Sequence, residues 1–185
     1  DIFGANGHLE NEIQKVQASQ TYEQKPHLFW NRGPGKGSNE FVRVPERVSG
    51  PAFSAPIVGR GSVNADLDGD GDLDLVITQC GRPARVLRND QQLGHHWVRV
   101  RLIGNGTTSN RDAIGAMVEA KVGDRVIRRN ASRTKSYLSQ SEGTLTFGIA
   151  TAEKIDGLTV YWPDGSTQNI SGPIEHGTTK VIEQE

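Results

Sequence analysis

The sequence predicts an all-β protein, and three observations lead to that class. Glycine is frequent, with 22 among 185 residues, whereas only 6% of the residues are aromatic, a balance that favours turn-rich sheets over packed helices. Short runs of β-branched residues alternate along the chain with clusters of Gly, Pro, Asn and Asp. In the C-terminal half these runs recur at the close spacing of a β-sandwich. We therefore expect very little helix.

The N-terminal half is expected to hold paired strands separated by long loops. Residues 28–31 and 41–44 flank a turn-rich segment and are predicted to form a hairpin. Residues 73–78 and 84–89 are predicted to pair in the same way after the turn at Cys80. The strand endings of the two units, at residues 28–31 and 86–89, look like one element used twice. Such an internal repeat is typical of a β-propeller or a repeat array.

A polar segment at residues 90–96 is interpreted as a linker, which divides the chain into domains at 1–93 and 94–185. Alternating apolar and polar residues predict that the second domain is a small β-sandwich. Its predicted strands cover residues 97–102, 116–122, 125–129, 145–147, 158–162, 167–170 and 179–182. Its predicted core consists of Trp97, Val100, Leu102, Val118, Leu145, Phe147, Leu158, Val160 and Val181.

The most specific motif is an acidic loop at residues 66–74, which carries Asp66, Asp68, Asp70, Asp72 and Asp74 and no basic residue. Alternate positions in a tight loop direct their side chains toward one point, and Ca²⁺ takes about six to eight oxygen ligands. Without a cation, neighbouring carboxylates would repel one another by roughly 1 kcal/mol per pair even in water. The spacing predicts one Ca²⁺ site, with Asp72 contributing its backbone carbonyl.

This loop begins like an EF-hand but continues differently. Gly71 permits the sharp turn, but the twelfth position is Ile77, where an EF-hand requires a bidentate Glu. The β-branched run that follows predicts that Asp74, the last ligand, opens a strand. The alternative interpretation is an acidic turn that is solvated and binds no metal.

Composition excludes several classes of partner. The formal net charge is −1, so there is no basic excess for nucleic-acid binding, and no run of about 18 apolar residues predicts a membrane span. The single cysteine forms no internal disulfide. We find no nucleophile elbow, His-Glu-x-x-His motif or phosphate loop. The start at Asp1 rather than Met indicates a processed or truncated piece.

Two further groups of polar residues each have two interpretations. Arg111 and Asp112, with Tyr137, could hold a polar ligand, or the first two could stabilise a turn. A basic stretch could bind an anionic polysaccharide or an acidic protein surface, or it could be a solvated strand face. That stretch comprises Lys121, Arg125, Arg128, Arg129, Arg133 and Lys135. His95 and His96 are interpreted as exposed linker residues rather than as metal ligands.

Motifs along nearly the whole chain closely resemble FG-GAP/VCBS propeller repeats followed by an ASPIC/UnbV domain, as in the cartilage acidic protein family and its bacterial relatives. The propeller resemblance rests on residues 6–8, 26–31, 59–61 and 66–74. The ASPIC/UnbV resemblance rests on residues 109–115, 136–141, 145–148 and 161–165.

The resemblance implies a calcium-bearing propeller whose last blades precede a C-terminal β domain. It also implies an extracellular, periplasmic or cell-surface location. A propeller needs about four to eight blades to close, so we expect this chain to be part of a larger protein. The predicted function is that of a calcium-binding extracellular recognition or adhesion module, with an extracellular protein or polysaccharide as partner and no catalytic residues. The alternative is part of a propeller-scaffold enzyme with a site at the junction of the two domains.

Overall fold

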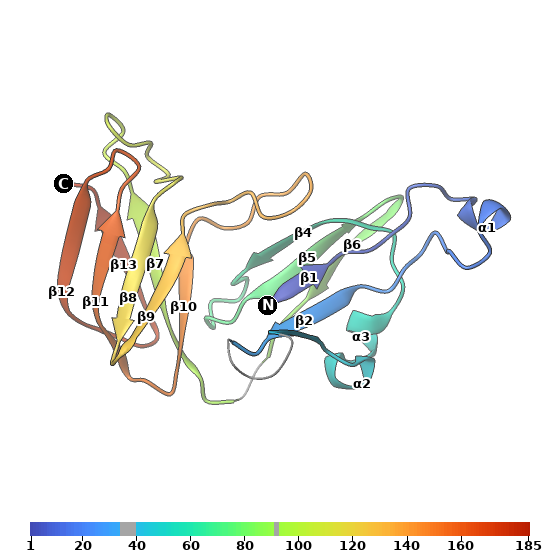
Figure 1. The fold of residues 1–185 in the computed structure, drawn as a ribbon, viewed down its shortest axis with the longest axis horizontal. Helices are drawn as coiled ribbons and strands as arrows, with labels where there is room; N and C mark the ends of the chain where they lie inside the picture. The colour runs from blue at the N-terminus through green and yellow to red at the C-terminus, as the bar shows by residue number, and fades with distance from the viewer. Residues whose placement is uncertain (34–39, 91–92) are drawn as a thin grey trace. The chain divides into compact units, whose positions relative to one another are not determined.

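The computed structural model describes residues 1–33, 40–90 and 93–185, and these residues are mostly in β-strands (Figure 1). The strands are β1 (Ile2–Gly4), β2 (His27–Asn31), β3 (Phe41–Arg43), β4 (Gly59–Ala65), β5 (Asp74–Gln79), β6 (Arg82–Leu87), β7 (His96–Ile103), β8 (Met117–Val122), β9 (Arg125–Asn130), β10 (Leu145–Ala150), β11 (Lys154–Tyr161), β12 (Thr167–Glu175) and β13 (Thr178–Glu183). Helix in the described residues is limited to three four-residue segments, α1 (Ile13–Val16), α2 (Glu46–Ser49) and α3 (Pro51–Ser54). The all-β prediction is therefore confirmed. No helix in the described part of the chain is long and apolar enough to cross a membrane.

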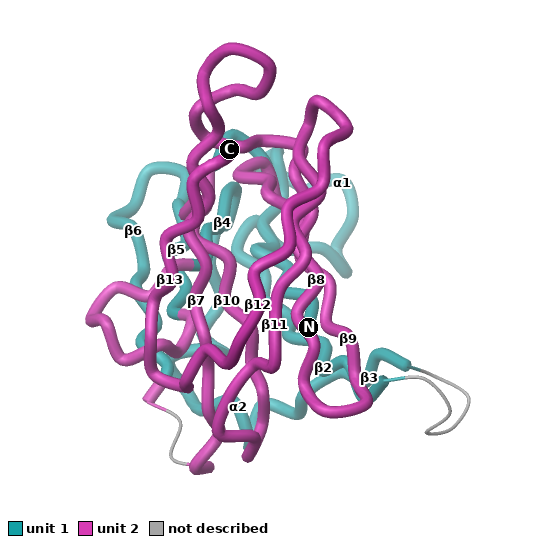
Figure 2. Tube along the Cα trace, turned by 90° about the vertical axis from the view of Figure 1, so that its left-hand side faces the viewer, with its two compact units in different colours: residues 1–64, 74–89, 136–139 teal, residues 65–73, 90–135, 140–185 magenta. Residues whose placement is uncertain are grey.

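The chain divides into two compact units, each assembled from separate segments (Figure 2). Unit 1 comprises residues 1–64, 74–89 and 136–139, and unit 2 comprises residues 65–73, 90–135 and 140–185. Most of the acidic loop therefore clusters with the C-terminal part, whereas the predicted boundary after residue 93 assigned it to the N-terminal part. That domain boundary stays a prediction.

Unit 1 contains two three-stranded sheets, with strand orders β1-β2-β3 and β4-β5-β6. The predicted hairpins are present: β2 pairs with β3 and β5 with β6, both antiparallel. The first hairpin's predicted tip at residues 34–39 lies outside the described residues. Ile57, Val58 and Ile77 are buried in this unit. The described residues do not form a propeller.

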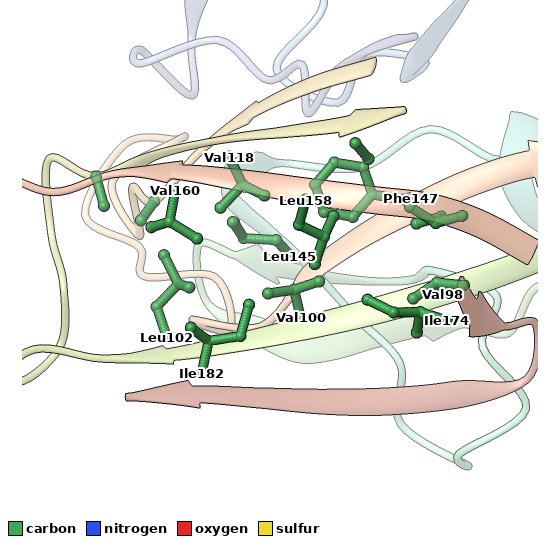
Figure 3. Close-up of a cluster of buried hydrophobic side chains, with 14 of the residues drawn as sticks. Val98, Val100, Leu102, Val118, Leu145, Phe147, Leu158, Val160, Ile174 and Ile182 are labelled. Carbon is green, nitrogen blue, oxygen red and sulfur yellow. The ribbon is translucent and has the colours of Figure 1, made fainter. Parts of the chain in front are cut away.

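Unit 2 contains two sheets whose apolar faces form one core. The strand orders are β10-β7-β13 and β12-β11-β8-β9. All pairings are antiparallel except that of β13, which runs parallel to β7. Both sheets contribute to a single cluster of buried apolar side chains (Figure 3). It includes Val98, Val100, Val118, Leu145, Phe147, Leu158, Val160 and Ile182. All seven strands predicted for this half of the chain are present.

Three predictions for this unit are wrong in detail. Trp97 is only partly buried and is not a member of the buried cluster, because its ring lies against Gly71 of the acidic loop. Val181 is 49% exposed, whereas its neighbour Ile182 is 3% exposed and belongs to the core. The register explains this, because Ile182 lies beside buried Leu102 on β7 and adjacent strand residues face opposite sides of a sheet. His96 is not a linker residue, since it begins β7 and is half-buried.

Candidate metal centre

The acidic loop makes two left-handed turns at glycine between β4 and β5. Gly69 and Gly71 have φ angles of +82° and +92°, which side chains with a Cβ rarely adopt. Gly71 also lies against Trp97, and a Cβ added at Gly71 would be 1.8 Å from a ring atom of that tryptophan. The indole N–H of Trp97 donates to the backbone carbonyl of Asp70 at 2.8 Å. The sharp turn predicted at Gly71 is therefore present and is fixed by close packing.

Three of the predicted ligands come together within this continuous loop. One carboxylate oxygen from each of Asp66, Asp68 and Asp74 lies within 4.8 Å of the others. Asp70 and Asp72 are not in that group, and the Asp70 carboxylate instead accepts a hydrogen bond from the Asp72 backbone N–H at 2.9 Å. Three carboxylates are a hard oxygen donor set of the kind that Ca²⁺ prefers, so the residues present fit the predicted ion.

Asp74 occupies the position that the sequence predicted. It is the first residue of β5 and is 1% exposed. Its Oδ1 accepts a hydrogen bond from the backbone N–H of Asn89 at 2.8 Å. A buried carboxylate requires such partners because its desolvation is costly, and this bond joins the end of the loop to the chain that follows β6.

The Asp66 carboxylate has several partners. Its Oδ1 accepts from the Gly69 N–H at 2.8 Å, and its Oδ2 accepts from the Gly71 N–H at 3.2 Å. Oδ2 also accepts from Arg99 of β7 at 2.7 Å, and the Asp66 side chain is 1% exposed. Arg99 makes a second ion pair with Glu142.

The nine-residue motif holds no basic residue, but the folded chain brings a basic residue from another segment to the loop. Arg99 is absent from the nine-residue motif, but it supplies a positive charge at the first aspartate. Sequence reasoning missed both Arg99 and Glu142. The only sequence signal was a basic residue at a half-buried position of a predicted strand, which does not identify its partner.

The structure places the predicted ligand-binding residues Arg111, Asp112 and Tyr137 in different surroundings. Asp112 forms an ion pair with Arg133 at 2.8 Å, and Arg111 lines a pocket of unit 2 of about 280 Å³ that Glu183 also borders. Tyr137 belongs to unit 1 and is 64% exposed. Their grouping into one ligand site stays a prediction.

Part of the predicted basic stretch already has partners in unit 2. Arg128 pairs with Glu119 at 2.6 Å, and the Arg129 guanidinium lies over the ring of Phe147, 5.8 Å from its centroid. Burial lowers the pKa of Arg129. These contacts favour the interpretation of Arg128 and Arg129 as strand residues that stabilise the sheet, although an anionic partner remains a prediction for the rest of the stretch.

Comparison with known proteins finds one family model and several relatives that match parts of this chain. Residues 106–185, which hold most of the two sheets of unit 2, match the family model described as ASPIC and UnbV. The chain is similar to cartilage acidic protein 1 of Homo sapiens, with 30% identity over 144 residues that make up 75% of this chain and 21% of that protein.

Two further relatives have the same name. Cartilage acidic protein 1 of Mus musculus is 30% identical over 125 residues, covering 66% of this chain and 19% of that protein. The Xenopus tropicalis protein is 29% identical over 160 residues, which make up 77% of this chain and 24% of that protein. The chain thus spans about a fifth of the length of the curated relatives it matches.

Proposed function

We propose that this chain is a calcium-binding recognition or adhesion module of a larger extracellular protein. One observation carries the proposal: Asp66, Asp68 and Asp74 bring carboxylate oxygens within 4.8 Å of one another in a loop closed by two left-handed glycines. A cation of high charge relieves the repulsion among these groups, and carboxylate oxygens are the ligands that Ca²⁺ takes in proteins.

The arrangement around Asp66 suits metal ligation. Arg99 and the Gly71 N–H both engage Oδ2, whereas Oδ1 accepts from the Gly69 N–H and in this proposal also ligates the metal. Asp68 and Asp74 then complete the carboxylate part of the site. The carbonyl of Asp72 and water molecules would supply further ligands, since Ca²⁺ accepts about six to eight oxygens.

The resemblance to FG-GAP/VCBS repeats extends the proposal to the surrounding fold. We assign residues 1–93 to the last blades of a β-propeller and residues 94–185 to a small β-sandwich-like domain. The sheets β1-β2-β3 and β4-β5-β6 support this assignment. A typical propeller blade is a small sheet of four strands, and each of these sheets has three. The remaining blades would belong to the larger protein. The location is extracellular, periplasmic or at the cell surface, and the partner is an extracellular protein or polysaccharide.

Calcium titration of chelator-treated protein tests the metal site. Calorimetry should show one Ca²⁺ per chain, with a Kd of about 0.1–1 mM, the range of extracellular modules. Since calcium binds the folded state, thermal stability should increase with its concentration, by about 2.7 kcal/mol when free calcium is 100 times Kd. Mg²⁺, which prefers small octahedral sites, should bind more weakly.

Asp68→Asn is the informative variant, because Asp68 is exposed whereas the side chains of Asp66 and Asp74 are buried. It should abolish the calcium-dependent increase in melting temperature while preserving the fold. Asp124→Asn, which removes the same charge from an exposed turn of unit 2, should keep the full increase. An unchanged melting temperature with calcium, or equal binding by both variants, would contradict the proposal.

A further inference from the structure

A second group of metal-binding side chains lies at one end of unit 2. His96 is the first residue of β7, Glu153 lies in the turn between β10 and β11, and His176 lies in the turn between β12 and β13. One ligand atom from each lies within 4.8 Å of the other two. The cluster is distinct from the acidic loop, because two of its three potential donors are imidazole nitrogens.

Backbone hydrogen bonds hold the three segments together. The His176 N–H donates to the Glu153 carbonyl at 2.9 Å, and the Gly177 N–H donates to the Trp97 carbonyl at 2.8 Å. The β12–β13 turn is therefore bonded both to the β10–β11 turn and to the start of β7. Because the backbone positions are fixed, binding a metal requires side-chain rotation only, which reduces the entropy lost on binding.

The hydrogen bond of His96 fixes the tautomer that a metal requires. Its Nδ1 lies 3.0 Å from the Ala152 carbonyl oxygen, and a carbonyl can only accept, so Nδ1 carries the proton. Nε2 then presents its lone pair. Metal-binding histidines almost always donate their second ring N–H to a carbonyl or carboxylate in this way.

The spacing of the other two donors also suits a small cation. His176 Nε2 lies 3.1 Å from a carboxylate oxygen of Glu153. Two ligands at typical Zn–N and Zn–O bond lengths around a tetrahedral ion are separated by about 3.4 Å. The His96 and His176 rings are stacked, with centroids 3.9 Å apart and planes 10° from parallel. Because the lone pair of an imidazole nitrogen lies in the ring plane, the stack must open by side-chain rotation before both nitrogens point toward one ion beside Glu153.

We propose that His96, Glu153 and His176 bind one Zn²⁺ ion, with water as the fourth ligand. Two imidazoles and one carboxylate are typical zinc ligands, whereas Ca²⁺ prefers an all-oxygen set. The site is open to the ion, because the side chains of His176 and Glu153 are 40% and 71% exposed. The bound ion links the beginning of β7 to two turns and stabilises this end of unit 2.

Zinc titration of the whole, untagged chain tests the site, with saturating calcium present so that the acidic loop does not compete. Calorimetry should show one Zn²⁺ per chain, and Co²⁺ as a probe should give the visible absorption of a tetrahedral complex. In NMR spectra, zinc should shift the ring signals of His96 and His176, because binding requires their stacked rings to move apart. The ring signals of His95 should stay unchanged.

Variants separate this site from general binding to histidine. His176→Ala should weaken zinc binding by at least about 100-fold, since loss of a mere outer-shell partner already costs about 10–100-fold. His95→Ala, which removes the adjacent exposed imidazole, should bind as the parent chain does. His176 lies in an exposed turn, and circular dichroism should show that both variants are folded. Failure of the parent chain to bind zinc, or equal affinity of the two variants, would overturn the proposal.

Discussion

At the scale of single residues, some polar side chains of unit 2 each make several hydrogen bonds that connect separate loops. Asp164 is the clearest case. Its Oδ1 accepts from the N–H and hydroxyl of Ser166 at 2.9 and 2.7 Å, and its Oδ2 accepts from Thr108 at 2.6 Å and from Gln184 at 2.8 Å. These bonds favour the ionised form, led by those from Thr108 and Ser166, and they lower the pKa of Asp164 from 3.8 to about 2.

This shift predicts a pH-dependent contribution to stability. Because the pKa is lower in the folded chain, ionised Asp164 stabilises the fold above about pH 4, and the effect is lost as the pH falls through about 2. Asp164→Asn should therefore lower the melting temperature above about pH 4. Melting curves of both proteins over this range test the prediction, since the difference should shrink as the pH approaches about 2. A difference that is constant with pH would contradict it.

At the scale of elements, the sequence was sufficient to place the strands but not to decide every register. Alternating apolar residues and turn clusters identified the seven strands of unit 2, because both signals are local. Val181 was assigned to the core wrongly because both Val181 and Ile182 are β-branched apolar residues. Only the pairing of β13 with β7 decides which of the two faces inward.

The candidate sites show the same division between local and nonlocal information. The acidic loop could be recognised because its ligands alternate within nine residues. Arg99 and Glu142 could not be assigned to it, since they lie on distant segments that only the folded sheet brings to Asp66. The cluster of His96, Glu153 and His176 was missed for the same physical reason.

The register of β13 predicts opposite results for two adjacent substitutions. Ile182→Ala should destabilise the protein by about 2–5 kcal/mol, because it removes buried methyl groups and leaves a cavity. Val181→Ala should change stability by only about 0.5 kcal/mol, since Val181 is half exposed. Urea denaturation of both variants measures the difference. Equal destabilisation would show that the pairing of β13 with β7 is shifted by one residue.

At the scale of the whole molecule, the core of unit 2 and its acidic loop come from separate parts of the sequence. All members of the apolar cluster lie between residues 98 and 182, so a fragment of residues 94–185 contains the complete core. We expect this fragment to unfold cooperatively. It lacks the loop at residues 65–73, however, and therefore lacks Asp66, the partner of Arg99.

The energetic link between loop and core can be measured with Arg99→Met. In the full chain this change leaves the Asp66 carboxylate buried without its cation, which should cost about 3–5 kcal/mol. In the fragment Asp66 is absent and only the pair with Glu142 is lost, so the cost should fall to about 1 kcal/mol. Urea denaturation of both pairs of proteins gives the two values, with a chelator present so that calcium cannot replace the lost charge.

Arg101→Met provides the matched control, because Arg101 lies on the same strand but is exposed. It should change stability by about 0.5 kcal/mol or less in both proteins. If Arg99→Met lowers the free energy of unfolding equally in the full chain and in the fragment, the loop does not stabilise unit 2 through Arg99. A larger cost in the full chain alone would instead establish that residues 65–73 stabilise unit 2 through one buried charge pair, although they belong to a distant part of the sequence.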